Sequence, residues 1–347
     1  MKTKKKNFLD LDPGDINKLL TSMGHGAYRT GQILKWVYLE KGRDFEGCSV
    51  LPAKLRKELD EKFTLRSLAL ESKEVSKKDG TIKFSFLTKD SNRISSVFLP
   101  YEDRNSACIS SQAGCETGCA FCATGAMGFK RDLTRGEILE QILQMEQETG
   151  ARISGILMMG MGEPLANFDN TVSALKTMMD SEILGLGRRH ITVSTVGHVP
   201  LIVKFAAANT GVRLALSLHA GDDRTRDKLV PFKKVPYSVD EIMKACLHYC
   251  RTANSRFTIE YVLVRGVNDS KKDAENLYNL IETHRMKGDM IQVNLIPYNK
   301  IENRRYLTSE HDTAENFKEY LMKKNIITVI RMPRGADIGA ACGQLGV

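Results

Sequence analysis

The spacing of apolar and polar residues changes several times along this chain and divides it into regions. From residue 107 onwards, short runs rich in β-branched residues alternate with longer segments in which apolar residues recur every three to four positions. This is the pattern of strands followed by helices. We predict strands over 107–111, 153–159, 190–195, 212–218, 257–264, 290–296 and 326–331, and helices over 134–148, 168–180, 199–208, 239–253, 270–285 and 312–323.

Repeated strand–helix units predict an α/β fold with a parallel sheet and helices outside it. Six such units and a final strand favour an open or partial barrel over a flat dinucleotide-binding sheet. In barrels of this kind, the reactive groups gather at the carboxyl ends of the strands. We therefore look for functional residues just after each predicted strand.

The residues before this region predict two smaller units. Over 7–66, Asp12 as an N-cap before Pro13 begins a helix, and apolar residues at helical spacing predict helices near Thr30–Glu40 and after Pro52. This unit is either a nucleic-acid-binding module or a packing domain, and its basic residues are Arg29, Lys35, Lys54, Arg56 and Lys57.

Residues 81–88 and 93–99 alternate with period two and are separated by a polar turn, so they predict an antiparallel sheet that connects the two larger parts. The predicted divisions are 1–66 (basic helical accessory domain), 67–106 (β connector), 107–332 (barrel) and 333–347 (C-terminal loop).

Composition places the chain among ordinary globular proteins, since 42% of its 347 residues are hydrophobic and 27% are charged. No run approaches the ~18 apolar residues of a membrane span, and the N-terminal lysines precede no apolar segment of a signal peptide. We expect a cytoplasmic protein with reduced thiols. The net charge of +9 fits a nucleic-acid partner without proving one.

Four of the eight cysteines lie within fifteen residues, and three of them, Cys115, Cys119 and Cys122, have the spacing C-x3-C-x2-C. A four-iron cluster needs one thiolate for each iron. Three cysteines therefore leave one iron open to a small molecule. The alternative is a zinc knuckle, which needs a fourth Cys or His nearby, and no histidine lies between His25 and His190.

Polar and flexible residues follow five of the predicted strands. The cysteine loop follows the first strand, Gly160-Met-Gly-Glu-Pro164 the second, and Pro297-Tyr-Asn299 the sixth. Ser194 and Thr195 end the third strand, and Ser217-Leu-His219 end the fourth. This coincidence is the strongest evidence in the residues themselves for a single site. Taken alone, Gly160-Met-Gly-Glu-Pro164 is equally well explained as a structural turn that binds nothing. The carboxylate of Glu163 within it suits a cationic amine.

The remaining cysteines give weaker signals. Cys342 lies in a segment rich in glycine and alanine near the end of the chain. On spacing alone, a buried structural cysteine is the default interpretation there. We apply the same interpretation to Cys48, Cys246 and Cys250.

Several of these motifs occur together in one known family. The cysteine loop, the Gly-Glu-Pro turn and the partial barrel resemble the radical S-adenosylmethionine enzymes. More narrowly, the chain resembles the RlmN/Cfr family of RNA adenosine methyltransferases over nearly its whole length. The motifs that carry this likeness are Cys108-Ile-Ser-Ser-Gln-x-Gly-Cys115, Met159-Gly-Met-Gly-Glu-Pro-Leu165, Ser217-Leu-His219 and Ala340-Ala-Cys-Gly-Gln-Leu345.

The resemblance implies a partial (β/α)6 radical-SAM barrel and a role for each matching residue. Cys115, Cys119 and Cys122 would hold a 4Fe–4S cluster whose open iron binds S-adenosylmethionine. Cys342 would carry a methyl group as S-methylcysteine, and Cys108 would be the resolving cysteine. The implied cofactor contacts are Gly162, Glu163, Ser194, Ser217, Leu218, His219 and Asn299.

The resemblance also implies a route with two S-adenosylmethionine molecules per turnover. One methylates Cys342, and the other is cleaved to a 5′-deoxyadenosyl radical that removes a hydrogen atom from that methyl group. The carbon radical adds to adenine, a proton leaves the adenine carbon, and Cys108 attacks the Cys342 sulfur to free the product. The implied partners are 23S rRNA, tRNA as a second candidate, and a reductant such as flavodoxin or ferredoxin; we expect a monomer and no membrane.

Two positions bear on the substrate. The family places a glutamate, the proton acceptor, thirteen residues before the first cysteine, where this chain has Ser95. Pro164 favours the enzymes that methylate adenosine C2, and methylation of C8, which gives antibiotic resistance, is the alternative. A non-catalytic iron–sulfur or zinc RNA-binding protein is the rival of another class, although it would not need Cys342.

Overall fold

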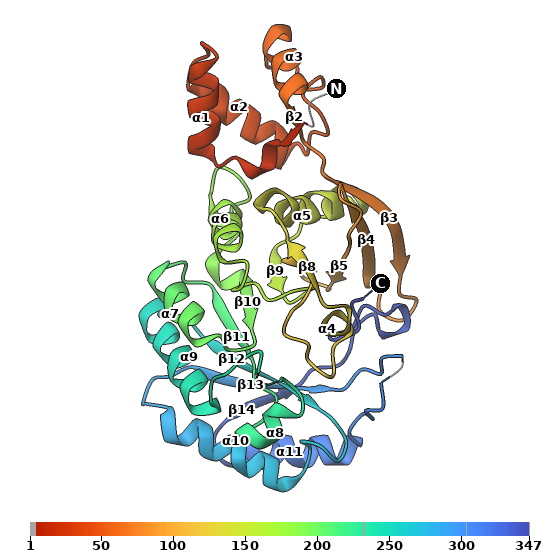
Figure 1. The fold of residues 1–347 in the computed structure, drawn as a ribbon, viewed down its shortest axis with the longest axis vertical. Helices are drawn as coiled ribbons and strands as arrows, with labels where there is room; N and C mark the ends of the chain where they lie inside the picture. Colours follow the sequence, from red (N-terminus) through yellow and green to blue (C-terminus); the bar gives the residue numbers. More distant parts are fainter. Residues whose placement is uncertain (1–4, 232, 303, 347) are drawn as a thin grey trace.

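The computed structural model describes residues 5–231, 233–302 and 304–346. A helical unit lies at one end of the molecule, and a curved sheet with helices on its outer face forms the rest (Figure 1). The strands are β1 (Lys6–Asn7), β2 (Phe63–Thr64), β3 (Leu68–Val75), β4 (Ile82–Thr88), β5 (Arg93–Pro100), β6 (Asn105–Cys108), β7 (Gln112–Gly114), β8 (Phe129–Asp132), β9 (Gly155–Met158), β10 (Ile191–Thr195), β11 (Arg213–Ser217), β12 (Phe257–Leu263), β13 (Ile291–Pro297) and β14 (Ile327–Ile330).

The α-helices alternate with the later strands. They are α1 (Pro13–Ser22), α2 (Tyr28–Leu34), α3 (Ala53–Lys62), α4 (Ala123–Met127), α5 (Arg135–Thr149), α6 (Phe168–Met179), α7 (Val199–Ala207), α8 (Asp223–Asp227), α9 (Val239–Ala253), α10 (Lys271–His284) and α11 (His311–Lys323). Short 3-10 helices lie at Phe8–Asp10, Arg188–His190 and Ala336–Ile338.

One ten-stranded sheet runs through the molecule in the order β14-β13-β12-β11-β10-β9-β6-β5-β4-β3. From β6 to β14 the neighbouring strands are parallel, whereas β3, β4, β5 and β6 pair antiparallel. The predicted α/β partial barrel is confirmed, with six strand–helix units and a final strand. The antiparallel connector is not a separate layer, because β5 pairs directly with the first barrel strand, β6.

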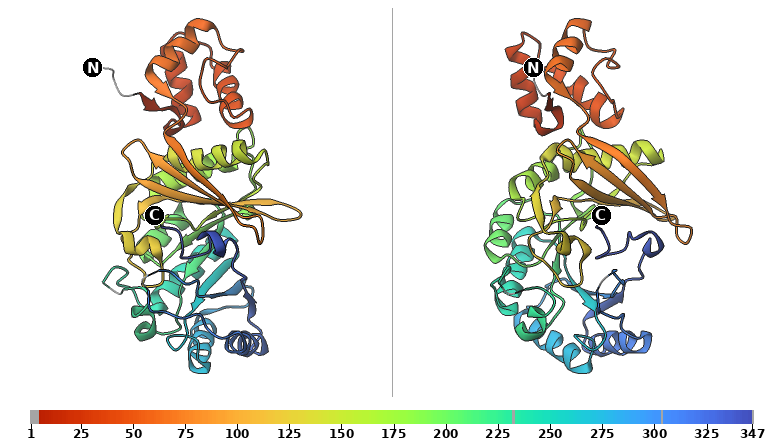
Figure 2. Two further views of the ribbon diagram at one scale, coloured as in Figure 1. Left: turned by 90° about the vertical axis from the view of Figure 1, so that its right-hand side faces the viewer. Right: turned by 45° about the vertical axis from the view of Figure 1, so that its right-hand side comes forward.

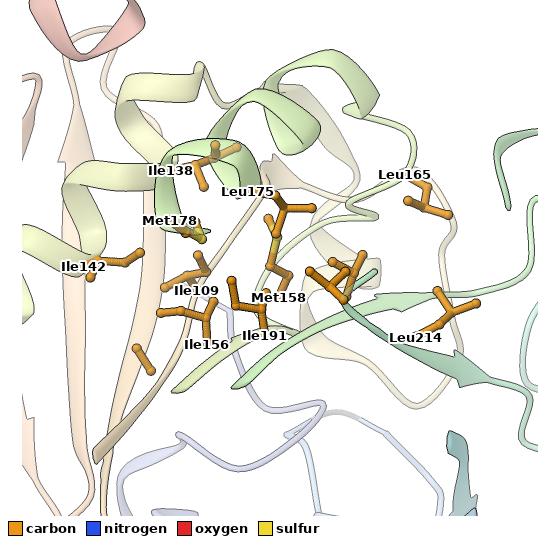
Figure 3. Packing of buried hydrophobic residues seen from close by; sticks show 14 of the residues in the cluster. Ile109, Ile138, Ile142, Ile156, Met158, Leu165, Leu175, Met178, Ile191 and Leu214 are labelled. Atoms are coloured by element: carbon orange, nitrogen blue, oxygen red, sulfur yellow. The ribbon is translucent and has the colours of Figure 1, made fainter. Parts of the chain in front are cut away.

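The core of the barrel lies between its strands and the outer helices. Ile138 and Ile142 of α5, together with Leu175 and Met178 of α6, pack against Ile156 and its neighbours on the strands (Figure 3). Capping boxes begin α5 at Thr134, α9 at Ser238 and α10 at Ser270, where each capping side chain accepts a hydrogen bond from a backbone N–H. This packing fixes the strand ends on which the candidate residues sit.

The N-terminal unit departs from its prediction in one detail. The helix predicted near Thr30–Glu40 continues beyond α2 as a π-helix over Lys35–Leu39. Its buried Val37 and Tyr38 contribute to a core that also includes Phe8 and Phe45. Strand β3 has no counterpart among the predictions, because most of its side chains are exposed and give no clear alternation.

The C-terminal segment, which we define as residues 331–346, leaves β14 and crosses back to the β3–β4 hairpin and α4 (Figure 2). The Arg334 side chain donates to the Asp79 carbonyl at 2.7 Å, and the Gly335 N–H donates to the Asp79 carboxylate at 2.9 Å. The Ser76 hydroxyl contacts the Asp337 carboxylate at 2.8 Å. The C-terminal segment therefore connects the two edges of the ten-stranded sheet, β14 and the β3–β4 hairpin.

Among the described residues, no helix is long and apolar enough to cross a membrane.

Candidate active site

The cysteine loop lies between β7 and α4, at the carboxyl end of the first barrel strand. Cys119 is buried, and Cys115 and Cys122 are half-buried. Burial raises the pKa of the Cys119 thiol well above its usual range, and the nearby Cys122 and Cys115 thiols raise it further. Gly114 has φ +77, and a side chain there would collide with the Gly128 carbonyl, so the tight approach of β7 to β8 requires glycine.

A cavity of about 160 Å³, here called the loop cavity, collects most of the predicted cofactor contacts. The three loop cysteines form part of its wall, and the rest comes from residues at or near the carboxyl ends of five barrel strands, β9 to β13, and from the C-terminal segment. The predicted contacts among its lining residues are Gly162, Glu163, Ser194, Ser217 and His219. Leu218 is fully buried and does not line this cavity, and neither does Asn299.

Glu163 points into the structure, and its carboxylate is held by backbone donors. Its two oxygens accept the N–H of Leu165 at 3.1 Å and of Val196 at 2.8 Å. Its own N–H donates to the Gln112 side chain at 2.9 Å. Burial raises the pKa of Glu163 to about 7, although these hydrogen bonds oppose the rise. The carboxylate therefore has a fixed position beside the loop cavity.

The two serines come from adjacent strands, β10 and β11, and meet in the cavity wall. The hydroxyl oxygens of Ser194 and Ser217 lie 3.3 Å apart. Such a hydroxyl pair can accept from or donate to the hydroxyls of a nucleoside.

His219 closes the other side of the loop cavity. Its backbone is left-handed, with φ +62, and its Nδ1 accepts the Val262 N–H at 3.0 Å. Burial lowers the pKa of His219 to about 3, so the ring is neutral. Its Nε2 is buried without a partner among the described residues. A bound ligand that hydrogen-bonds to this nitrogen would satisfy it.

Two residues missing from the sequence predictions organise this site. Phe121, inside the cysteine loop, packs edge-on against the His219 ring at 4.5 Å between centroids. Arg226 of α8 is nearly buried and donates to the carbonyls of Val196, Ser217 and Leu218, which follow β10 and β11. No local motif marks either residue, because the partners of both are far away in the sequence.

A second cavity of about 280 Å³, here called the main cavity, adjoins the first and holds both Cys108 and Cys342. Cys122, Glu260 and Cys342 line both cavities. Burial raises the pKa of Cys108 to about 12, and the Cys342 thiol contributes to that rise. The two thiols are thus electrostatic neighbours across 234 positions of sequence, and both are free in the structure.

Cys342 is exposed to the cavity, yet protein atoms surround its sulfur. This desolvation, followed by the charge of Glu260, raises the pKa of the Cys342 thiol to about 11. Three hydrogen bonds fix the backbone around it. Asn299 donates to the Cys342 carbonyl at 3.0 Å, Ala123 N–H to the Gly343 carbonyl at 2.7 Å, and the Gln344 side chain to the Lys300 carbonyl at 3.0 Å.

Ser95 lies on β5 and lines neither cavity. It is 4% exposed, its N–H contacts the Met161 sulfur at 3.3 Å, and its carbonyl accepts from the Ser110 hydroxyl at 2.6 Å. Val97 and Leu99, two and four residues further along the strand, do line the main cavity. Residue 95 therefore belongs to the strand face that looks toward the main cavity, but a serine side chain does not reach it.

The residues around the loop cavity fit a 4Fe–4S cluster and S-adenosylmethionine. Three thiols on one loop leave one iron of a four-iron cluster open. The unpartnered Nε2 of His219 and the Ser194–Ser217 pair are polar groups at the cavity wall with which a bound nucleoside can form hydrogen bonds. Gly162 lines the cavity and has φ +99, and a side chain there would collide with Gln112, so this turn of the cavity wall requires glycine.

Comparisons with known proteins agree with this geometry. Residues 109–281 match the family model of the radical SAM superfamily, and residues 6–65 match that of the ribosomal RNA large subunit methyltransferase N-terminal domain. Over 98% of this chain and 99% of the other, the fold is similar to the crystal structure of a radical SAM methyltransferase from Sphaerobacter thermophilus, with a TM-score of 0.91 and 38% identity.

Two relatives are both named probable dual-specificity RNA methyltransferase RlmN. The protein from Endomicrobium trichonymphae is 46% identical and covers 99% of this chain and 97% of its own. The protein from Thermotoga neapolitana is 44% identical and covers 98% of this chain and 97% of its own. The chain therefore belongs to the RlmN family of radical S-adenosylmethionine methyltransferases.

Proposed function

We propose that this enzyme methylates C2 of an adenosine in 23S rRNA, with tRNA as a second substrate, through a methyl group carried on Cys342. The observation that carries the proposal is the shared main cavity of Cys108 and Cys342, which adjoins the cavity of the three loop cysteines. The methyl carrier must reach the substrate carbon and the resolving thiol must reach the sulfur of the carrier, and these two residues line one cavity.

Cys115, Cys119 and Cys122 would hold the 4Fe–4S cluster, and Gly162, Glu163, Ser194, Ser217 and His219 would contact S-adenosylmethionine. When bound, these groups supply the methyl group and the radical that activates it, using two S-adenosylmethionine molecules per turnover. The chain's own part is to position the reactants and to exclude water. Leu218 and Asn299 stay predicted contacts, and Asn299 here orients the Cys342 backbone.

The proposed reaction needs both Cys108 and Cys342 for a chemical reason. Adenine C2 is an electron-poor carbon without a lone pair, so it cannot take a methyl group by ordinary nucleophilic transfer. A carbon bound to the Cys342 sulfur can add to it, which leaves RNA linked to the protein. Attack by the Cys108 thiolate on the Cys342 sulfur forms an S–S bond, breaks the S–C bond and frees the product.

Charge in the main cavity supports RNA as the substrate. Four guanidinium groups line it, those of Arg213, Arg256, Arg331 and Arg334, against the single carboxylate of Glu260 in the part of the chain that the structure describes. Guanidinium groups bind phosphate with bidentate geometry. The two relatives are named as RNA methyltransferases, which supports RNA as well.

The remaining parts of the proposal concern the surroundings of the enzyme. A low-potential protein such as flavodoxin or ferredoxin would reduce the cluster, and the enzyme would work as a cytoplasmic monomer because RNA supplies the large interface.

One experiment tests the reaction. The anaerobically reconstituted enzyme is incubated with S-adenosylmethionine, reductant and an RNA fragment, and the digested nucleosides are separated. We expect 2-methyladenosine together with 5′-deoxyadenosine. The appearance of 8-methyladenosine instead would contradict the C2 assignment, and the absence of 5′-deoxyadenosine with a fully reduced cluster would contradict the enzyme assignment.

A further inference from the structure

The proposed methylation leaves one group unassigned. Replacing the hydrogen on adenine C2 by carbon requires a proton acceptor within reach of the bound base. The hydroxyl of Ser95 is a poor base near neutral pH, and Ser95 does not line the main cavity. The inference below rests on the proposed function and concerns which residue takes this proton.

Glu260 is the candidate that the geometry supplies. It lies in the middle of β12, where it is in register with Ser217 of β11 and Asn294 of β13. It lines the main cavity and the loop cavity at once, as Cys342 does. Glu260 therefore lies where the two cavities meet, and it shares the lining of the main cavity with Val97 and Leu99 of β5.

The hydrogen bonds of Glu260 use only one of its oxygens. Oε1 accepts from the Thr258 hydroxyl and from the Asn294 amide, each at 2.8 Å. No hydrogen bond to Oε2 occurs among the described residues, and this oxygen is the one left for a substrate. The two donors hold the carboxylate in a single orientation, which a general base requires.

Electrostatics agree with this placement. Burial raises the pKa of Glu260, and the hydrogen bonds of Asn294 and Thr258, with the charge of Arg331, only partly oppose the rise. A carboxylate with a raised pKa is a better proton acceptor near neutrality. The charge of Glu260 in turn raises the pKa of Cys342, so the carboxylate and the methyl-carrying sulfur are close.

We propose that Oε2 of Glu260 accepts the proton that leaves adenine C2 once the carbon on Cys342 has bonded to C2. The C2–H bond breaks, its electron pair stays in the ring, and the carboxylate becomes a carboxylic acid. The unpaired electron of the adduct takes no part in this proton transfer; it would return to the cluster, which gave one electron to cleave S-adenosylmethionine, so the adduct is closed-shell before Cys108 attacks. When Cys108 displaces the carbon from the Cys342 sulfur, the S–C electron pair goes to that carbon, and the protonated Glu260 returns a proton to it, completing the methyl group.

The test compares Glu260→Gln and Glu260→Asp with the wild-type enzyme. Gln keeps an oxygen that accepts from Thr258 and Asn294 but cannot take a proton, whereas Asp keeps the base with a shorter reach. The matched control is Glu146→Gln, a change at a nearly buried carboxylate of α5 that lines neither cavity. Three quantities are measured: methyl on Cys342 by peptide mass spectrometry, 2-methyladenosine formed, and the isotope effect with RNA deuterated at adenine C2.

We expect Glu260→Gln to methylate Cys342 as the wild type does and to form about a hundredfold less 2-methyladenosine, or less still. Glu260→Asp should lie between the two, and Glu146→Gln should match the wild type. The deuterium isotope effect should be larger in both Glu260 variants than in the wild type, because proton transfer becomes slow. A purely structural role would lower the product without changing the isotope effect.

Three results would overturn the assignment. They are product formation by Glu260→Gln within about threefold of the wild type, an unchanged isotope effect, and loss of methyl from Cys342 in Glu260→Gln. Failure of the proposed function looks different, because the wild type itself would then form no 2-methyladenosine.

Discussion

The backbone N–H of Ala123 donates to the carbonyl of Gly343 at 2.7 Å. Ala123 directly follows the last cysteine of the loop, and Gly343 directly follows Cys342. The next residue of α4, Thr124, also hydrogen-bonds to the Leu345 carbonyl through its hydroxyl. The backbone position of Cys342, the proposed methyl carrier, is therefore held by the same short helix that ends the cysteine loop.

This link predicts that Gly343→Ala impairs methyl loading. Gly343 has φ +84, and a side chain there would come within 3.0 Å of the Phe121 carbonyl. Forcing a side chain into this conformation costs about 1–3 kcal/mol, and we expect the segment around Cys342 to shift instead. Methyl occupancy of Cys342, measured by mass spectrometry, should fall severalfold. Gly31→Ala, a change in an open helical position, is the control and should leave occupancy intact.

Cys108→Ala should trap the intermediate in which RNA is covalently bound to Cys342. The resolving thiol is gone, so the S–C bond cannot be broken by disulfide formation. Denaturing gels and mass spectrometry of the linked peptide measure the adduct. Cys48→Ala changes a buried cysteine far from the cavities and should give no adduct. Free product from Cys108→Ala at the wild-type rate would refute the role of Cys108.

A glutamate placed at residue 95 should substitute in part for Glu260. The cavity-facing side of β5 carries residue 95, and a longer side chain there can reach the main cavity. Ser95→Glu alone should leave the rate within about twofold of wild type, because Glu260 already acts as the base. In the Glu260→Gln background, the same change should recover at least about a tenth of the wild-type rate. Initial rates of 2-methyladenosine formation by the double variant and by Glu260→Gln measure this recovery. Equal rates for the two would contradict the prediction.

RNA binding should depend on the arginines of the main cavity. For single-stranded RNA, each lost phosphate contact lowers the slope of log affinity against log salt by about 0.7. We expect Arg213→Gln and Arg256→Gln each to lower the slope by that amount and to weaken binding at low salt. Arg251→Gln, at an arginine paired with Asp289 at 2.7 Å, should change neither quantity. Equal slopes for all variants would exclude phosphate contacts in this cavity.

Acid should release the C-terminal segment. Partial burial works to raise the pKa of Asp79, but hydrogen bonds from Thr81 and from the Gly335 N–H outweigh it and hold the pKa at about 2. A free aspartate titrates at about 3.9. The ionised form therefore stabilises the docked segment above about pH 4, and this contribution is lost as the pH falls toward 2.

Hydrogen exchange of residues 335–346, corrected for the intrinsic pH dependence, measures this release. Protection should fall between pH 5 and pH 2.5 in the wild-type protein. In Asp79→Asn it should be low at both values, and a wild-type segment that stays equally protected at both would contradict the anchoring role.

The sequence predicts the barrel well and the site less completely. Strands β9 to β14 and the helices α6, α7, α9, α10 and α11 carry clear periodicity, and each falls within about two residues of its prediction, whereas the five-residue helix α8 has no counterpart among the predictions. The convergence of Glu163, Ser194, Ser217 and His219 follows from one rule about strand ends. Arg226, Phe121 and Glu260 do not follow from it, because their roles depend on contacts between distant segments and not on any local pattern.

The closure made by the C-terminal segment has a consequence for turnover. The ten-stranded sheet has two edges, β14 and β3. The segment that carries Cys342 links the edge at β14 to the β3–β4 hairpin at the other edge. Asp79 and Asn299 are two of the residues that hold this segment in place through hydrogen bonds. A movement that separates this segment from the hairpin would break the hydrogen bonds to Asp79 and free the backbone that leads to Cys342. Under the proposed function, movement of this segment, which lines the main cavity, would therefore change access to that cavity and the position of Cys342 together.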